Sequence, residues 1–337
     1  MTMTSNRQID QIGEKLREGN KLTKDEYQNL IQWRNSFSPT MDYYHKKLKE
    51  IIHEDSRIAV AKRIKRIESI KIKLERFRTM RLSTLQDIAG LRVILKDKEK
   101  LERAAIAIRN AENTNKIKRL DDYHARPKED GYRGIHFVLQ SSKSRTIEIQ
   151  LRTELEHIWA TAVEVYGTLQ KVSFKTGEGH EDWGEFFKYL SSYLALQEFS
   201  PCLKEHEKLN EKKIIKKIKK YILNLHVIER LNAVANNTET IINKRGKGRS
   251  GKYALLELDY KSNITCIEIF PKKEIDKAIE EYTKKELSFK EGDGRNIVFV
   301  NIESIEKLQV AYPNYFLDTK KLLKILATIV LKNSIHN

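Results

Sequence analysis

The spacing of hydrophobic residues changes several times along the chain, and each change predicts a different kind of element. Near the N-terminus apolar residues recur at helical spacing, which predicts helices at 9–18, 23–37 (with Thr23 as N-cap) and 42–76. Shorter runs rich in apolar and β-branched residues then predict strands at about 87–95, 134–140 and 146–152. Helical spacing also predicts helices at 97–111, 154–165 and 183–196. Helices that flank a mixed β-sheet indicate the α+β class.

The C-terminal part has a different pattern. Residues 203–243 are expected to form a Lys-rich helical segment, and the basic, Gly-rich stretch 244–252 is expected to be a linker. The remaining pattern predicts a small β-β-α-β-α domain, with elements at 253–259, 264–270, 275–287, 296–301 and 304–310, and a closing helix at 319–332. The predicted domains are therefore 1–243 and 253–337.

Four residues within a short stretch suggest a site for a highly charged anion. Arg63, Lys65 and Lys73 are cations, and the hydroxyl of Ser69 lies between them. If a helix begins near Ser69, its free N–H groups and dipole also favour an anion such as a polyphosphate. The alternative is an ordinary solvated basic helix face.

Two carboxylates and an aromatic residue make the polyphosphate interpretation more coherent. Asp87 opens a predicted strand, and Glu148 lies on the polar face of another, together with Gln150 and Arg152. Carboxylates on separate strands can hold a Mg²⁺ that phosphates also bind. Tyr132, which follows a glycine turn, offers a π-face for a base.

In their order along the chain, these motifs resemble the synthetase domain of the RelA/SpoT family over residues 40–200. That family transfers pyrophosphate from ATP to a ribose 3′-hydroxyl and has a nucleotidyltransferase-like fold. The resemblance implies that Arg63 stacks on adenine and that the ATP phosphates are held by Lys65, Ser69 and Lys73. It also implies that Mg²⁺ is bound by Asp87 and Glu148.

The resemblance further implies roles in the transfer step and in binding the acceptor. Glu148 would help to deprotonate the attacking hydroxyl, and Tyr132 would stack on the acceptor base. The residues expected around that base are Lys128, His136, Gln150 and Arg152. One departure concerns Asp121, because the family often has a basic residue just before the Asp-Tyr pair.

A short C-terminal motif suggests regulation. Tyr312 and Tyr315 flank a Pro-Asn turn, and they either pack on the small domain or project from it. A small domain with such a turn after a synthetase domain resembles the fused toxin–antitoxin synthetases of the CapRel type. In that group the C-terminal domain is zinc-finger-like but lacks metal, and its tyrosines can occupy the adenine site. The resemblance implies that a phage structural protein, typically capsid, releases this autoinhibition during anti-phage defence (abortive infection).

Composition bears on the partner and the compartment. The net charge of +17 favours a polyanion such as RNA, and a Lys-rich helical face supplies possible contacts in Lys216, Lys217, Lys219 and Lys220. Cys202 and Cys266 are isolated, so neither a disulfide scaffold nor zinc is expected. No membrane span or signal peptide is expected either, which points to the cytoplasm.

Three functions remain open from the sequence. The first choice is a toxin that pyrophosphorylates the 3′-CCA end of tRNA and so stops translation. The second is a (p)ppGpp synthetase that uses ATP with GDP or GTP. The third is a catalytically silent RNA-binding or sensor protein, against which the intact pair of Asp87 and Glu148 argues.

Overall fold

The computed structural model describes most of the chain. The described residues are 5–52, 59–111, 116–141, 145–173, 180–237, 239–244, 253–259, 261–289, 295–301, 308–309, 312 and 319–332. The chain divides into two compact units. The first comprises 1–93, 104–121 and 136–150, and the second comprises 94–103, 122–135 and 151–337.

The first unit begins with three helices, α1 (Asn6–Arg17), α2 (Lys24–Asn35) and α3 (Ser38–Ile51). Thr23 is the N-cap of α2, as predicted: its side chain accepts from the Glu26 N–H, and Glu26 bonds back to the Thr23 N–H. A fourth helix, α4 (Ile67–Arg76), packs against α1.

The predicted helix 42–76 was wrong in its middle. Strand β1 (Ala59–Ile64) separates α3 from α4, so Arg63 lies on a strand and Ser69 lies in the first turn of a helix. The sequence Ala-Val-Ala-Lys-Arg-Ile is compatible with the residue spacing of a helix and with that of a strand. Pairing with β2 is a long-range contact that decides in favour of the strand.

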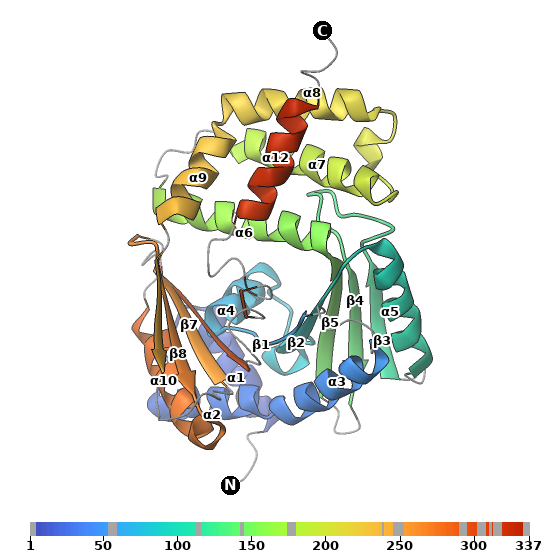
Figure 1. The fold of residues 1–337 in the computed structure, drawn as a ribbon. Coiled ribbons are helices and arrows are strands. Elements are labelled where there is room, and N and C mark those ends of the chain that lie inside the picture. The colour runs from blue at the N-terminus through green and yellow to red at the C-terminus, as the bar shows by residue number, and fades with distance from the viewer. Residues whose placement is uncertain are drawn as a thin grey trace. The chain divides into compact units, whose positions relative to one another are not determined.

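β1 is the edge of a five-stranded sheet with the order β1-β2-β5-β4-β3 (Figure 1). The other strands are β2 (Ala89–Leu95), β3 (Ile117–Asp122), β4 (Ile135–Gln140) and β5 (Thr146–Thr153). Helix α5 spans Lys98–Ala111. The sequence predicts β2, β4, β5 and α5 closely but misses β3, because this edge strand is largely polar and only partly buried.

The second unit contains a helical bundle. Its helices are α6 (Glu154–Ser173), α7 (His180–Gln197), α8 (Glu211–Asn224), α9 (Val227–Asn237) and α12 (Lys320–Leu331). Figure 1 shows the C-terminal α12 lying across the other helices. Leu322, Leu326 and Ile329 of α12 belong to the same buried core as Trp159 of α6 and Trp183 of α7. The helix expected to close the C-terminal domain therefore packs on helices that precede residue 243.

The second unit also contains a four-stranded sheet with the order β6-β8-β7-β9. Its elements are β6 (Glu239–Lys244), β7 (Tyr253–Asp259), β8 (Ile264–Phe270), β9 (Arg295–Asn301) and α10 (Ile275–Ser288). The predicted β7–β8 hairpin is confirmed as an antiparallel pair. The Lys-rich segment is not helical to residue 243, because β6 pairs in parallel with β8. The domain boundaries at 243 and 253 stay predictions.

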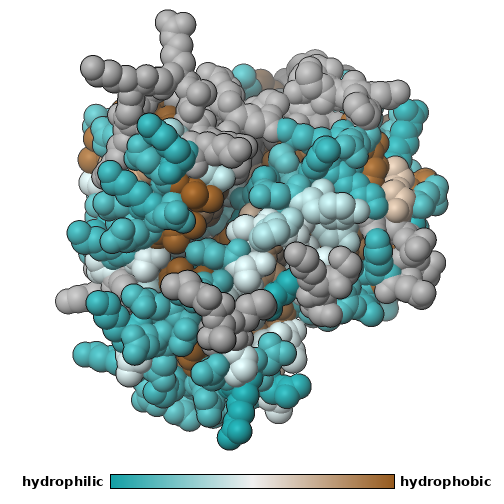
Figure 2. All heavy atoms as spheres, turned by 90° about the horizontal axis from the view of Figure 1, so that it is seen from below, coloured by the Kyte–Doolittle hydropathy of each residue, from teal (hydrophilic) through white to brown (hydrophobic). Residues whose placement is uncertain are grey.

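Short 3-10 helices span Leu82–Thr84, Lys204–His206 and Lys272–Glu274. Of the predicted helix 304–310, only 308–309 fall within the described residues. The face drawn in Figure 2 is mostly hydrophilic, with hydrophobic residues in small patches. Among the described helices, none is both long enough and apolar enough to cross a membrane.

Candidate active site

Two lysines converge on one carboxylate in the first unit. Lys65 Nζ lies 3.1 Å and Lys73 Nζ 2.7 Å from the same oxygen, Oδ2 of Asp87. The Lys65 N–H also donates to the Ile88 carbonyl (2.8 Å), which fixes the end of β1 beside the start of β2. The structure therefore brings together two lysines from one stretch and a carboxylate from the start of the next strand region, three residues that the sequence assigned to one site.

The electrostatics of Asp87 reflect this arrangement. Burial by itself would raise the pKa of Asp87, but Lys65 and Lys73 outweigh it and lower that pKa below its usual range. Burial lowers the pKa of Lys65, an effect that Asp87 partly offsets. The other oxygen of Asp87, Oδ1, is buried and has no hydrogen-bond partner among the described residues. A buried oxygen of this kind is available to a cation.

Glu148, on β5, is the second carboxylate. His136 Nδ1 lies 3.0 Å from Glu148 Oε1, and the Gln150 amide donates to Oε2 (2.8 Å). Burial by itself would raise the pKa of Glu148, but His136, Gln150 and Lys73 lower it to about 2. Glu148 is therefore an anion at neutral pH. His136 and Gln150 were expected to contact the acceptor, and in the structure both contact Glu148.

Arg63 and Ser69 border this charged group. Arg63 is half-buried on β1, and its charge contributes to the lowered pKa of Lys65. Ser69 lies in the first turn of α4, whose N-cap residue, Arg66, makes no side-chain capping bond. The positive end of the helix dipole at this turn favours an anion. Gly90 on β2 has the carbonyls of both Glu148 and Arg63 within 4 Å of where a Cβ would be, so these residues flank β2.

Arg34 is a site-supporting residue that the sequence reasoning missed. Its guanidinium is 2% exposed, and Nη2 donates to the Lys65 carbonyl (2.8 Å). Arg34 shares the apolar face of α2 with Leu30 and Trp33. The signal that could have identified Arg34 is a charged residue at helical spacing on an apolar face.

The donors present suit Mg²⁺. Mg²⁺ prefers oxygen ligands and usually binds through one or two carboxylates together with substrate phosphates. Asp87 offers an unpartnered oxygen, and its pKa responds to the charge of Glu148, so the two carboxylates lie near each other. The part of the chain that the structure describes has no cluster of three or more His, Cys, Asp or Glu residues able to hold a metal. Phosphates would have to complete the coordination.

Two of the residues expected to bind the acceptor base, Lys128 and Tyr132, lie in the second unit on the segment 123–134, which we call the acceptor loop. A third, Arg152, lies on β5. Tyr132 is half-buried, and its hydroxyl accepts from Arg152 Nη2 (2.9 Å). Lys128 Nζ lies 5.1 Å from the Tyr132 ring and 4.4 Å from the ring of Tyr123. The Tyr132 ring also meets Trp159 edge-on at 6.5 Å. Lys128 and Arg152, two of the four residues expected around the acceptor base, thus lie beside Tyr132, and Tyr123 adds a contact that had no assigned role.

Two glycines give the acceptor loop its path. Gly131 has φ +93°, and a Cβ there would lie 3.0 Å from the Cβ of Ser191 and 3.1 Å from the Trp159 ring. Gly134 has φ +140°, and a Cβ there would lie 3.0 Å from the Leu151 carbonyl. Only glycine fits these backbone angles and this space without strain.

The remaining candidate residues have varied surroundings. Asp121, the departure noted in the sequence, pairs with Arg119 (2.8 Å). Lys216, Lys217 and Lys220 are exposed on α8, whereas Lys219 is half-buried and donates to the Val330 carbonyl (2.8 Å).

The tyrosine motif is only partly described. Tyr312 is 5% exposed, and its N–H donates to the Leu308 carbonyl (2.9 Å). Tyr315 lies outside the described residues.

One known protein family matches the middle of the chain. The model of the family described as "Region found in RelA / SpoT proteins" matches residues 62–178. This region includes every candidate residue from Arg63 to Arg152. Residues 62–178 are therefore similar to a region found in RelA/SpoT proteins.

Relatives match over the same part of the chain. A GTP pyrophosphokinase of Photobacterium angustum is 29% identical over 142 residues, which are 42% of this chain and 19% of that protein. A GTP pyrophosphokinase of Haemophilus influenzae is 33% identical over 102 residues (30% of this chain and 13% of that protein). An uncharacterised protein of Mycobacterium tuberculosis is 29% identical over 168 residues, or 48% and 58% of the two chains. The chain thus spans less than a fifth of the two pyrophosphokinases.

Solved structures of synthetases also match. The small alarmone synthetase 1 from Bacillus subtilis, bound to its product pppGpp, is 27% identical with a TM-score of 0.41, covering 50% of this chain and 93% of that chain. A GTP pyrophosphokinase family protein from Streptococcus pneumoniae is 22% identical with a TM-score of 0.36, covering 50% and 91%.

Proposed function

We propose that the chain transfers a pyrophosphoryl group from ATP to a hydroxyl of a nucleotide or nucleic-acid acceptor. The observation that carries the proposal is the convergence of Lys65 and Lys73 on Asp87, with Glu148 close enough to respond to Lys73. With Arg63, three cations face two carboxylates. This surplus of positive charge suits the phosphates of ATP.

Each ATP-facing residue has a distinct part. Lys65 and Lys73 bind the phosphates and offset the charge that develops on the transferred group. The Ser69 hydroxyl donates to phosphate oxygens at the positive end of the α4 dipole, and Arg63 stacks on adenine. In the transfer, the acceptor hydroxyl oxygen bonds to the β-phosphorus while the bond from that phosphorus to the α-phosphate oxygen breaks, and AMP leaves.

Asp87 and Glu148 are the residues that would hold Mg²⁺, which when bound neutralises phosphate charge and orients the in-line attack. A carboxylate with a pKa of about 2 is a weak base. We therefore assign Glu148 to cation binding and to orienting the acceptor hydroxyl, and give it less of the deprotonating role that the sequence suggested.

For the acceptor, we propose the 3′-CCA end of tRNA, which makes the chain the toxin of a fused toxin–antitoxin defence protein. The support comes from the net charge of +17 and from the exposed Lys216, Lys217 and Lys220 on one helix. An RNA partner explains such a surplus, because its phosphates provide much of the binding free energy. The alternative acceptor is GDP or GTP, which would make the chain a (p)ppGpp synthetase. Two relatives carry the name GTP pyrophosphokinase, and the chain spans less than a fifth of each.

Offering each acceptor separately tests this choice. Purified chain is given ATP labelled in its β-phosphate, with tRNA in one reaction and GDP or GTP in another, and we expect label on tRNA. Replacing Lys216, Lys217 and Lys220 by Glu should weaken tRNA modification and flatten its salt dependence. The charge-matched control replaces Lys273, Lys277 and Lys284, which are also exposed, by Glu. This control should change neither the extent of tRNA modification nor its salt dependence. Label on GDP or GTP alone would establish the alternative.

For regulation, we propose that Tyr312 and Tyr315 hold the synthetase inactive by occupying the adenine site, until a phage structural protein such as capsid binds the C-terminal region. Tyr312 is buried. Burial of its ring is expected both if the ring occupies the adenine site and if it packs in the core of the small domain. A partner must favour the open state by about 5.5 kcal/mol to move the balance from roughly 1:99 to 99:1. Replacing both tyrosines by Ala should raise the ATP affinity of the isolated chain. Unchanged affinity would leave them as packing residues.

A further inference from the structure

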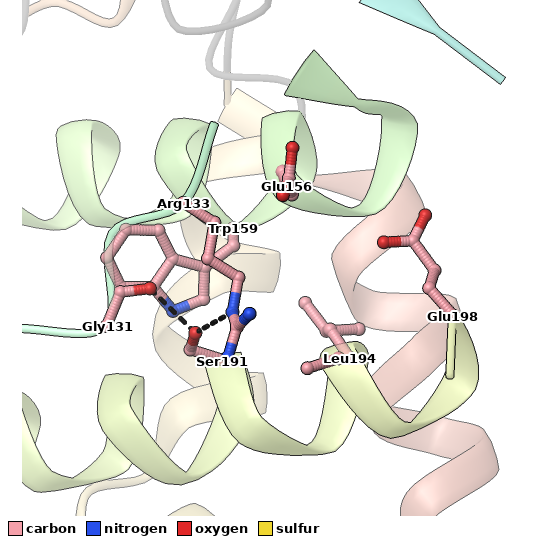
Figure 3. A pocket seen from close by; sticks show the side chains of 8 residues that line it. Gly131, Arg133, Glu156, Trp159, Ser191, Leu194 and Glu198 are labelled. Atoms are coloured by element: carbon pink, nitrogen blue, oxygen red, sulfur yellow. Dashed lines mark hydrogen bonds between the residues drawn. The ribbon is translucent and has the colours of Figure 1, made fainter. Parts of the chain in front are cut away.

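Ser191, on α7, contacts the acceptor loop on both sides of Tyr132. Its hydroxyl donates to the Gly131 carbonyl (2.6 Å) and accepts from Arg133 Nε (3.1 Å), as the dashed lines of Figure 3 mark. Ser191 is 1% exposed. One buried hydroxyl therefore fixes the residues immediately before and after Tyr132 in the sequence.

Arg133 extends this connection. Its guanidinium is 5% exposed, and its two remaining nitrogens donate to backbone carbonyls: Nη1 to His124 (3.3 Å) and Nη2 to Pro201 (2.5 Å). It thus ties the end of the acceptor loop to the start of the same loop and to the segment after α7.

His124 anchors the start of the loop. Its Nδ1 lies 2.7 Å from Glu156 Oε1 on α6, and its Nε2 lies 3.2 Å from the Ser200 hydroxyl. Glu156 Oε2 also accepts from the Thr153 N–H (2.9 Å), so the partner of His124 is itself fixed at the start of α6. His124, Glu156 and Ser200 are all at most 6% exposed. These bonds are shielded from water and have little competition from it.

A small pocket lies beside the acceptor loop. Its lining includes Gly131, Arg133, Glu156, Ser191 and Glu198 (Figure 3).

We propose that Ser191, Arg133 and His124 are positioning residues of the acceptor site. These residues act on the acceptor only through Tyr132. They fix the position and orientation of the Tyr132 ring, and that ring sets the affinity for the acceptor. We call these three residues the loop clamp. The inference deepens the proposed function, on which it rests for the identity of the acceptor.

Two adjacent serines of α7 provide a matched test. Ser191→Ala removes both bonds to the loop. The control is Ser192→Ala: Ser192 is 0% exposed, and its hydroxyl binds His206 Nδ1 (2.9 Å) and the Leu203 N–H (3.2 Å), both outside the loop. Ser191→Ala should raise the KM for the acceptor by about tenfold and leave the KM for ATP within about twofold, whereas Ser192→Ala should change neither. Ser200→Ala, which removes the Ser200 bond to His124, is the milder second variant if Ser191→Ala folds poorly.

Hydrogen exchange supplies a readout that does not depend on the reaction. The amides of Lys128 and Gly131 bond within the loop, to the carbonyls of Tyr132 (3.1 Å) and Lys128 (2.9 Å). They should exchange faster in Ser191→Ala than in Ser192→Ala. Equal exchange in the two variants, or faster exchange with an unchanged acceptor KM, would overturn the loop clamp. If the natural chain modifies neither tRNA nor GDP or GTP, the proposed function fails, and the exchange comparison still decides whether the clamp fixes the loop.

Discussion

The Lys73 ammonium lies 2.7 Å from Oδ2 of Asp87, and the same ammonium lowers the pKa of Glu148. One cation on α4 therefore stabilises the charged form of carboxylates from two separate strand regions. Without it, the two carboxylates would repel each other in a partly buried site. This relationship explains why a lysine of α4 and two acidic residues later in the chain belong to one site.

Removing either carboxylate should abolish pyrophosphoryl transfer while the fold is retained. Asp87→Asn or Glu148→Gln removes a ligand of the cation that offsets charge on the transferred group, so we expect a loss of roughly 10³-fold or more in kcat. The rate of AMP formation measures it. Glu26→Gln is the control, because Glu26 also pairs with a lysine (Lys15, 2.6 Å) and lies on α2. A folded Asp87 variant with full activity would refute the assignment.

Tyr132 should act on the acceptor alone. Tyr132→Ala removes the stacking face, which we expect to cost about 1–3 kcal/mol of acceptor binding and to leave ATP affinity unchanged. Tyr132→Phe keeps the ring and loses only the bond from Arg152. Its acceptor affinity should therefore lie between that of the Ala variant and that of the natural chain. Titration of acceptor and ATP separately gives both affinities. An equal loss of ATP affinity in the Ala variant would contradict this role.

Glu198 should make stability depend on pH near neutrality. Burial raises the pKa of Glu198 from 4.5 to about 7, although the bond from Thr153 partly opposes the shift. The folded carboxyl then binds its proton more tightly than the unfolded one, so the free energy of unfolding falls as pH rises from about 4.5 to 7. Glu198→Gln should flatten this slope, as measured by denaturant unfolding at a series of pH values. Glu207→Gln, on an exposed carboxyl, is the control, and an unchanged slope in Glu198→Gln would contradict the shift.

The C-terminal helix should be essential to the stability of the bundle. Leu326 of α12 is 0% exposed in the core shared with α6 and α7, so Leu326→Ala should cost about 2–5 kcal/mol of unfolding free energy. Leu331→Ala, on a residue of the same helix that is 62% exposed, should cost far less. A chain ended at residue 250 lacks α12, and we expect it to be unstable rather than a freely active toxin. Similar stabilities of the two leucine variants would contradict this expectation.

Some of the fold and site could be predicted from the sequence because local signals were strong. The apolar runs of β2, β4 and β5, the Thr23 cap and the glycine turn before Tyr132 are all local patterns. The site carboxylates were found because each interrupts or opens an apolar strand.

The rest depends on contacts between distant residues. β1 became a strand only through pairing with β2, and the role of α12 depends on a core formed by helices far earlier in the chain. His124 of the loop clamp bonds to Ser200, which lies 76 residues later in the chain. Arg34 bonds to Lys65, which lies 31 residues later. No spacing rule within the sequence indicates such pairs.

The central claim is that the β- and γ-phosphates of ATP move together, and the nucleotide left behind tests it most directly. Purified chain is incubated with Mg²⁺, ATP labelled in its α-phosphate and total tRNA or GDP/GTP, and the labelled nucleotides are separated. The account predicts labelled AMP that forms only when an acceptor is present, in amounts equal to the acceptor modified, and none with Asp87→Asn. Labelled ADP in place of AMP would show transfer of a single phosphate and would contradict the account.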